Sequence, residues 1–252
     1  MATLLSVIIT AYQAEAYLEE CLHSVCNADY PNLQIVLVDD GSTDNTQDIC
    51  ERWATIDARI ELHQRDHQGR NAALKFAHSK ARGEVQCVVD ADDIVLPKAF
   101  TRSIDKLSDS HQLVYTYRDL IDSRGNTITV HDKNRIQYRP NQLLVDNMIF
   151  HLRTFTTRLF EKAGGVGEFE RCEDWDENLR MSEHTNVRCI PQVLYRYRIH
   201  ESQISRTTRQ NEEGAIAVRN AIKRRGLNLD LVVNDKGFHL RQRKTPPPLS
   251  LP

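Results

Sequence analysis

The 252-residue sequence lacks several features that mark common protein classes. Its net charge is only −2, so its overall charge gives no reason to expect nucleic-acid binding. Its six cysteines form no CxxC pair, which argues against a zinc site or a disulfide framework. We therefore expect buried free thiols in a reducing compartment.

The sequence also lacks an apolar run long enough to cross a bilayer. Residues 4–9 are apolar, but the stretch is short, has no basic leader and is typical of a strand. A cytoplasmic protein is expected, with the inner face of a membrane as a site of peripheral contact. The basic amphipathic segment 212–225 is the candidate for that contact, and a solvated helix face is the simpler interpretation.

Short apolar runs alternate with helical patterns in the first hundred residues. The runs cover residues 5–10, 35–38, 60–62 and 85–89. Apolar residues at helical spacing follow each of the first three runs. This alternation predicts an α/β fold, with a mostly parallel sheet flanked by helices and right-handed crossovers.

The second half of the chain has a mixed pattern. Strands are predicted at 113–117, 151–156 and 193–197, and helices at 175–183 and 212–225. Residues 121–128 predict a hairpin that turns at Gly125-Asn126. From residue 241 the sequence is polar and then proline-rich, which predicts an extended or disordered tail.

Three carboxylates, those of Asp90, Asp92 and Asp93, directly follow the fourth apolar run. Carboxylates this close repel one another, and a divalent cation that bridges to a phosphate would compensate them. The alternative is an acidic turn before the helix that opens near Pro97. These residues alone leave both interpretations open.

Polar or aromatic residues also follow the first two apolar runs. Tyr12 comes after the first and Asp40 after the second, so both are expected at the same sheet edge as the acidic cluster. Arg70 opens the helix before the fourth run, where a cation could meet a phosphate. Each residue alone has a simpler explanation, such as a core tyrosine or a turn at Asp40. Together they indicate a pocket for a nucleotide diphosphate.

Segments 6–12, 38–44 and 89–93, in this order and spacing, resemble the inverting glycosyltransferases of family 2, which have the GT-A fold. The resemblance continues through Gly164-Gly165 and through segments 173–176 and 195–200. It implies a GT-A (Rossmann-like) mixed, mostly parallel sheet flanked by helices.

The resemblance also implies a division of the chain. Residues 1–205 would form the GT-A domain, with a nucleotide-sugar-binding half at 1–110 and an acceptor and catalytic-base half at 111–205. Residues 206–252 would form a basic helical extension with a proline-rich tail.

The first segments imply the nucleoside site. By resemblance, Ala11 and Tyr12 line the nucleobase and ribose pocket, with Glu15 near the ribose. Asp40 would accept a hydrogen bond from the uracil N3–H, assisted by Asp39.

The acidic segment and the late segment imply the diphosphate site. Asp92 would approach the ribose, and Asp93 would bind the Mn²⁺ or Mg²⁺ ion that bridges the donor diphosphate, with Asp90 supporting it. His200 would bind the same metal, and Arg198 would help to close the site over the diphosphate.

The remaining matches imply positions near the reacting sugar. Arg70 would lie near the pyrophosphate, and Gly165, with Gly164, would let the backbone approach the donor sugar or the acceptor. Asp174 takes the place of the catalytic base, which would deprotonate the acceptor hydroxyl. Glu173 and Asp174 are also suited to the first turn of a helix, and both roles are compatible.

The sequence departs from the family pattern at three places. His67-Gln68 stand where the family has small residues, which leaves the register of Arg70 open. The Gln-x-x-Arg-Trp motif of processive members is absent, and so are membrane spans, so transfer of single sugars is favoured.

The other histidines, among them His67, His78 and His151, have no ligand spacing, and most are expected on the surface or in loops.

The expected activity is metal-dependent, inverting and non-processive transfer of a sugar from a UDP-sugar or another nucleotide-diphosphate sugar. The acceptor would be a glycan or a lipid-linked hydroxyl in polysaccharide or glycoconjugate synthesis. One alternative is a nucleotidylyltransferase, but residues 11–15 are not the glycine-rich basic loop of that class. The other is a non-catalytic nucleotide-sugar-binding scaffold, which retention of every acid of the pattern disfavours.

Overall fold

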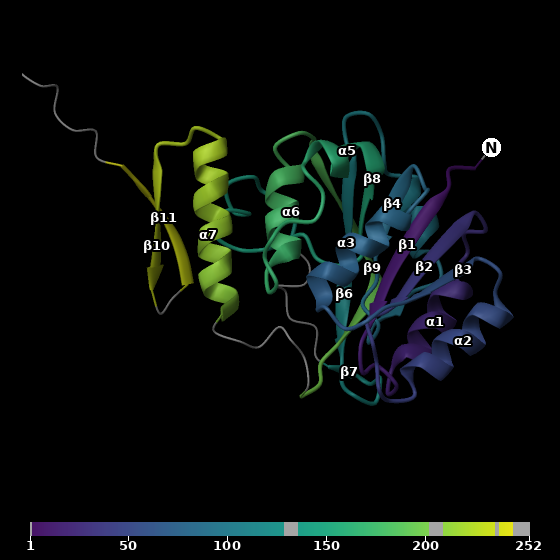
Figure 1. The fold of residues 1–252 in the computed structure, drawn as a ribbon. Coiled ribbons are helices and arrows are strands. Elements are labelled where there is room, and N and C mark those ends of the chain that lie inside the picture. Colours follow the sequence, from purple (N-terminus) through teal and green to yellow (C-terminus); the bar gives the residue numbers. More distant parts are fainter. Residues whose placement is uncertain (1, 129–135, 202–208, 235–236, 244–252) are drawn as a thin grey trace, which may run out of the picture.

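The computed structural model describes residues 2–128, 136–201, 209–234 and 237–243 (Figure 1). Its centre is a nine-stranded sheet with the strand order β3-β2-β1-β4-β8-β6-β9-β5, in which β7 also pairs with β6. The order is that of a mixed, mostly parallel sheet, and helices flank it. The predicted fold class is confirmed.

The first four strands form the parallel part of the sheet. They are β1 (Leu5–Ala11), β2 (Leu33–Asp39), β3 (Ile60–Gln64) and β4 (Val85–Val88). β1 pairs in parallel with β2 and β4, and β2 pairs in parallel with β3. All four predicted runs are therefore strands, and the carboxyl ends of β1, β2 and β4 share one edge.

The two faces of this parallel part are covered by different helices. The helices are α1 (Leu18–Cys26), α2 (Thr46–Ile56) and α3 (Arg70–Lys80). Val7 and Ile9 of β1 share a core with α1 and α2, whereas Ile8 lies in a second core with Ala73 and Leu74 of α3. Successive strand residues point to opposite faces, so an uninterrupted apolar run is what a strand covered on both sides requires.

The second half of the chain completes the sheet. Its strands are β5 (Ile94–Val95), β6 (Leu113–Ile121), β7 (Thr127–Ile128), β8 (Arg153–Thr156) and β9 (Val187–Arg198). Its helices are α4 (Ala99–Ile104), α5 (Thr157–Lys162) and α6 (Glu173–Met181). β8 runs antiparallel to β4 and β6, and β9 is parallel to β6. The hairpin predicted at 121–128 is confirmed by the pairing of Leu120 with Ile128.

The C-terminal part packs against α6 (Figure 1). It consists of α7 (Arg209–Arg224), β10 (Leu229–Asn234) and β11 (Gly237–Gln242). Ala217, Val218 and Ala221 of α7 share a core with Leu179 and Met181 of α6. The helix predicted here is confirmed. The sequence pattern missed the β10–β11 hairpin, and the proline-rich segment lies outside the described residues.

Two expectations about chemistry can be compared with the described ranges. All six cysteines are free, and four of them are buried, as expected. No helix in the described ranges is both long enough and apolar enough to cross a membrane.

Candidate functional site

The acidic cluster lies in the turn between β4 and β5. Asp90, Asp92 and Asp93 each offer a carboxylate oxygen, and these oxygens lie within 4.8 Å of one another. The backbone N–H of Asp93 donates to the Asp90 carbonyl at 3.1 Å, so the turn itself gathers the side chains. Three oxygen ligands at this spacing suit Mg²⁺ or Mn²⁺.

Asp93 is the least compensated member of the cluster. Its side chain is fully buried; Oδ1 accepts the Arg198 backbone N–H at 2.8 Å, but Oδ2 has no hydrogen-bond partner. Burial, together with the charges of Asp92 and Asp90, raises the pKa of Asp93 well above its usual range, while the Arg198 N–H and the Tyr195 hydroxyl oppose the shift. A buried carboxylate oxygen without a donor fits a site built for a cation.

Asp90 is compensated by protein cations instead. Arg70 Nη2 lies 2.7 Å from Asp90 Oδ1, and His151 Nε2 lies 3.3 Å from Oδ2. Burial alone would raise the pKa of Asp90, but Arg70 and His151 lower it well below its usual range. His151 lies in a bend just before β8, whereas the strand was predicted to begin at residue 151, and its side chain is buried against the acidic cluster.

Arg70 links the acidic cluster to α6. Its Nε donates to Glu173 Oε1 at 2.9 Å while its Nη2 binds Asp90, so one guanidinium joins two carboxylates. Glu173 begins α6, and Asp174 is the next residue. The two acidic motifs of the sequence therefore lie at one site, with Arg70 between them.

Asp92 and the late segment meet at the side of this cluster. His200 Nε2 lies 2.8 Å from Asp92 Oδ2. The Arg198 guanidinium binds the Asp92 carbonyl through Nε at 2.7 Å and Glu20 Oε2 through Nη2 at 2.5 Å, and it lies over the Tyr17 ring. The Arg198 side chain is thus fully buried, and the backbone N–H of the same residue donates to Asp93 Oδ1.

The predicted nucleoside residues lie at the ends of β1 and β2. Tyr12 is 48% exposed, and its ring stacks on His67 with the centroids 3.9 Å apart. His67 Nδ1 lies 2.9 Å from Asp40 Oδ2, so this histidine joins the two predicted residues. Ala11 is buried, and its carbonyl accepts the Asp40 N–H at 2.9 Å.

Most of the carboxylate of Asp40 is engaged by the loop before α3. Oδ2 accepts the backbone N–H groups of Gln68 at 3.2 Å and Gly69 at 2.8 Å, and Arg65 Nε lies 3.1 Å from Oδ1. Glu15 Oε2 similarly accepts from the Asn45 backbone N–H at 3.0 Å and from its side-chain amide at 2.6 Å. Both acids hold the local loops in place.

Arg118 of β6 is a cation that the motifs did not indicate. Its guanidinium lies 3.9 Å from the centroid of Phe150 and 4.4 Å from that of Tyr197. Burial lowers the pKa of Arg118, while the charges of Asp93 and Asp174 are among the groups that raise it. A positive charge therefore lies near both the acidic cluster and the predicted base.

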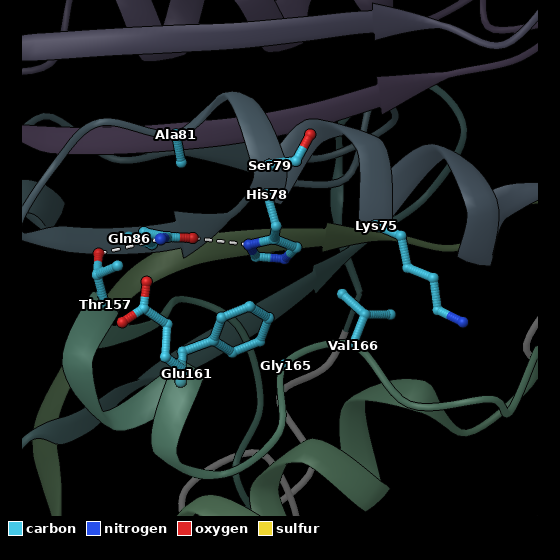
Figure 2. A pocket seen from close by; sticks show the side chains of 10 residues that line it. Lys75, His78, Ser79, Ala81, Gln86, Thr157, Glu161, Gly165 and Val166 are labelled. Atoms are coloured by element: carbon cyan, nitrogen blue, oxygen red, sulfur yellow. Dashed lines mark hydrogen bonds between the residues drawn. The ribbon is translucent and has the colours of Figure 1, made fainter.

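Gly165 lines a separate cavity of about 340 Å³ between α3 and α5 (Figure 2). No member of the acidic cluster lines it. His78 reaches toward Gln86 in this cavity, and Gln86 binds Thr157 (Figure 2). Gly164 and Gly165 both have positive φ, at 91° and 65°, which explains the glycine pair at the end of α5.

The sequence offered little signal for three residues that the fold brings to the site. The only signal for His67 is that it stands at a position where the resembled family has a small residue. Arg118 and His151 lie in segments without a motif, and only the pairing of β6 and the position of β8 place them near the acids.

Comparisons with known proteins find a matching family model and several similar proteins. A family model described as Glycosyl transferase family 2 matches residues 6–164. The glycosyltransferase GlyG of Streptococcus pneumoniae is 35% identical over 129 residues, which are 50% of this chain and 43% of GlyG. A chondroitin synthase of Escherichia coli is 28% identical over 229 residues, which are 89% of this chain and 33% of the synthase. The chain thus spans less than half of these two relatives.

Two solved structures share the fold. The Staphylococcus aureus TarS structure with UDP-GlcNAc has a TM-score of 0.73 and 18% identity, and the match covers 87% of this chain and 66% of that one. The mannosyltransferase PcManGT of Pyrobaculum calidifontis, in complex with GDP-Man and Mn²⁺, has a TM-score of 0.66 and 20% identity, over 89% of this chain and 64% of that one.

Proposed function

Because the chain belongs to glycosyl transferase family 2, we propose that it transfers a sugar from a nucleotide-diphosphate donor to a hydroxyl acceptor, with inversion at the anomeric carbon. One observation carries this proposal. Arg70 joins Asp90 of the acidic cluster to Glu173, the neighbour of Asp174, so that a metal-binding motif and a candidate base belong to one site.

A Mn²⁺ or Mg²⁺ ion would be held by Asp93, with Asp90 supporting it, and Asp92 of the same cluster would face the ribose. The unpartnered Asp93 Oδ2 supports this assignment. His200, hydrogen-bonded to Asp92, would join from the late segment. The bound cation supplies positive charge that neutralises the donor diphosphate and its leaving group. Mn²⁺ with GDP-Man in PcManGT is consistent with this role.

Asp174 would act as the general base. Inversion needs a base on the side of the sugar opposite the leaving group, where it takes the proton of the attacking acceptor hydroxyl. Asp174 lies in the first turn of α6, at the positive end of the helix dipole. Arg118, close to both Asp93 and Asp174, would face negative charge that develops between them.

A UDP-linked donor is proposed from the nucleoside side of the site. The half-exposed Tyr12 ring offers a surface for a nucleobase, beside the ring of His67. Asp40 lies 2.9 Å from His67 and would accept the base N–H with a lone pair that its loop partners leave. UDP-GlcNAc in the similar TarS fold supports this choice.

The acceptor is proposed to be a growing polysaccharide or another glycoconjugate, extended by single sugars. The chondroitin synthase relative supports a polysaccharide product. The exposed side of α7, with Ile216, Arg219 and Lys223, supports peripheral contact with an anionic membrane surface on the cytoplasmic side.

The test combines binding with turnover. UDP should stabilise the protein against heat only when Mn²⁺ is present, and Asp174→Asn should keep that stabilisation. The same variant should lose sugar transfer, or UDP release from a panel of sugar nucleotides, by orders of magnitude. Equal UDP binding with Mn²⁺ and with a chelator would overturn the metal role, and full turnover of Asp174→Asn would remove Asp174 as the base.

A further inference from the structure

The carboxylate of Asp174 receives a hydrogen bond at each oxygen. The Trp175 backbone N–H donates to Oδ1 at 2.7 Å, and Asn147 Nδ2 donates to Oδ2 at 2.8 Å. We infer that Asn147 is a positioning residue for Asp174, and that a chain of two side-chain amides, Asn178 followed by Asn147, sets the direction of this hydrogen bond. The inference rests on the proposed function, because it concerns the proposed base.

The direction of the first amide is fixed by groups with a single hydrogen-bonding role. Asn178 Nδ2 donates to the Ile149 carbonyl at 3.0 Å, and a carbonyl can only accept. On its other side, Asn178 Oδ1 accepts from Arg153 Nη1 at 3.4 Å, and a guanidinium can only donate. A flipped Asn178 would therefore place donor against donor and acceptor against acceptor.

The first amide then fixes the second. Asn178 Nδ2 also donates to Asn147 Oδ1, at 3.2 Å. The Asn147 oxygen is thus directed toward Asn178, and its Nδ2 is directed toward Asp174. Asn147 can serve the carboxylate only as a donor, and a donor is what the ionised form requires.

The anchors of this amide chain are buried. Arg153 is buried and lies 2.8 Å from Glu177 Oε2 of α6. Asn178 is fully buried, and Asn147 is followed by the buried residues Met148 and Ile149. The turn before Asn147 is also tied to α6, because Trp175 Nε1 donates to the Leu143 carbonyl at 2.8 Å. Asn147 therefore has little freedom to leave Asp174.

The charges around Asp174 make this support useful. Glu173 and Glu177 lie on the same helix, and the negative charge of Asp174 is one cause that raises the pKa of each, after burial. The nearby cations include Arg70, which pairs with Glu173, as well as Arg153 of β8 and Arg118 of β6. Asn147 adds a donor without adding charge, and it leaves further lone pairs of both carboxylate oxygens for the acceptor hydroxyl.

A purely structural role for Asn147 would predict a different result from a positioning role. If the Asn147 side chain only held segment 139–150 against α6, its removal would lower the stability of the protein without changing the rate of the chemical step. If it positions Asp174, its removal lowers kcat while donor binding is kept, because a small displacement of a base costs rate.

The experiment compares Asn147→Ala with Asn141→Ala, an exposed asparagine in the same segment. With the full chain, Mn²⁺ and a UDP-sugar, kcat for UDP release should fall about 10- to 100-fold in Asn147→Ala. It should stay unchanged in Asn141→Ala, and the UDP dissociation constant should change in neither variant. Asn178→Ala should also lower kcat, but by much less when Asn147 is already alanine, because the two act in one chain.

A measurement that needs no turnover separates this inference from the proposed function. The NMR signals of the Asn147 side-chain amide should move in Asp174→Asn and in Asn178→Ala, and stay in place in Asn141→Ala. Unmoved signals, additive effects of the two alanines, or unchanged kcat in Asn147→Ala would overturn the positioning role. Failure of Asp174→Asn to reduce turnover, with moved amide signals, would instead refute the proposed base.

Discussion

Replacing Asp93 by asparagine should stabilise the metal-free protein while it removes metal-dependent donor binding. Asp93 Oδ2 is a buried acceptor without a partner, and such a group costs about 1–3 kcal/mol. An asparagine amide would place a neutral donor beside Asp90 and Asp92. In a chain of this size, each kcal/mol shifts the midpoint of thermal unfolding by about 2–4 °C. We therefore expect Asp93→Asn to melt about 2–12 °C above the wild type in chelator at neutral pH.

The stability difference between Asp93→Asn and the wild type should depend on pH in a defined direction. The pKa of Asp93 is raised in the folded protein, so the folded state keeps a proton that the unfolded chain releases above about pH 4. The wild type consequently loses stability as the pH rises from about 4 toward the folded pKa. Asparagine does not titrate, so the advantage of Asp93→Asn should be small near pH 4 and should grow toward neutral pH.

The assay is thermal unfolding in chelator, and with Mn²⁺ and UDP, at two pH values. A ligand at a hundred times its dissociation constant adds about 2.7 kcal/mol to the wild type, and Asp93→Asn should gain none of it. Asp92→Asn is the matched control for the chelator measurement alone, because Asp92 is partly exposed and hydrogen-bonded to His200 but belongs to the proposed donor site. If Asp93→Asn in chelator melts at or below the wild-type temperature at neutral pH, the uncompensated carboxylate is not a source of instability and the reasoning fails.

Two further variants test the surroundings of the site. Arg70→Met should lower the free energy of unfolding by about 3 kcal/mol in urea titrations, because it leaves the buried Glu173 without its cation and Asp90 with His151 alone, and the exposed Arg124→Met should change it little. Burial lowers the pKa of His78 to about 4, so as the pH falls the unfolded chain binds a proton before the folded protein does, and the wild type loses stability. His78→Leu should lose less stability than the wild type between pH 6.5 and pH 4. The wild-type loss over that interval is at most about 3 kcal/mol, and an equal loss in His78→Leu would exclude this histidine as its cause.

The fold was predictable where local pattern and burial agree. β1 and β2 are continuous apolar runs because both of their faces are covered, so a short window of sequence contains the signal. β5 has only two residues, Ile94 and Val95, and it is a strand because it pairs with Tyr195 and Arg196 of β9. No window of the sequence contains that information.

The site shows the same division between local and distant information. The acidic cluster was predictable because three neighbours in sequence share one turn. The position of Arg70 at the start of a helix indicated a cation near a phosphate. Its contact with Glu173 spans 103 residues and depends on how α3 and α6 pack, which no local pattern shows. Arg198 was expected to face the diphosphate, but no pattern indicates that its guanidinium would bind backbone carbonyls of nearby turns.

The packing of α7 on α6 affects how truncation experiments on this chain should be interpreted. α6 carries Asp174 at its start, and its buried residues Leu179 and Met181 share their core with Ala217 and Val218 of α7. A chain cut before α7 would uncover that apolar side and loosen the support of a carboxylate that α7 need never touch. Loss of activity after such a cut could therefore be explained by the lost packing of α7 on α6. It would not identify a substrate-binding segment.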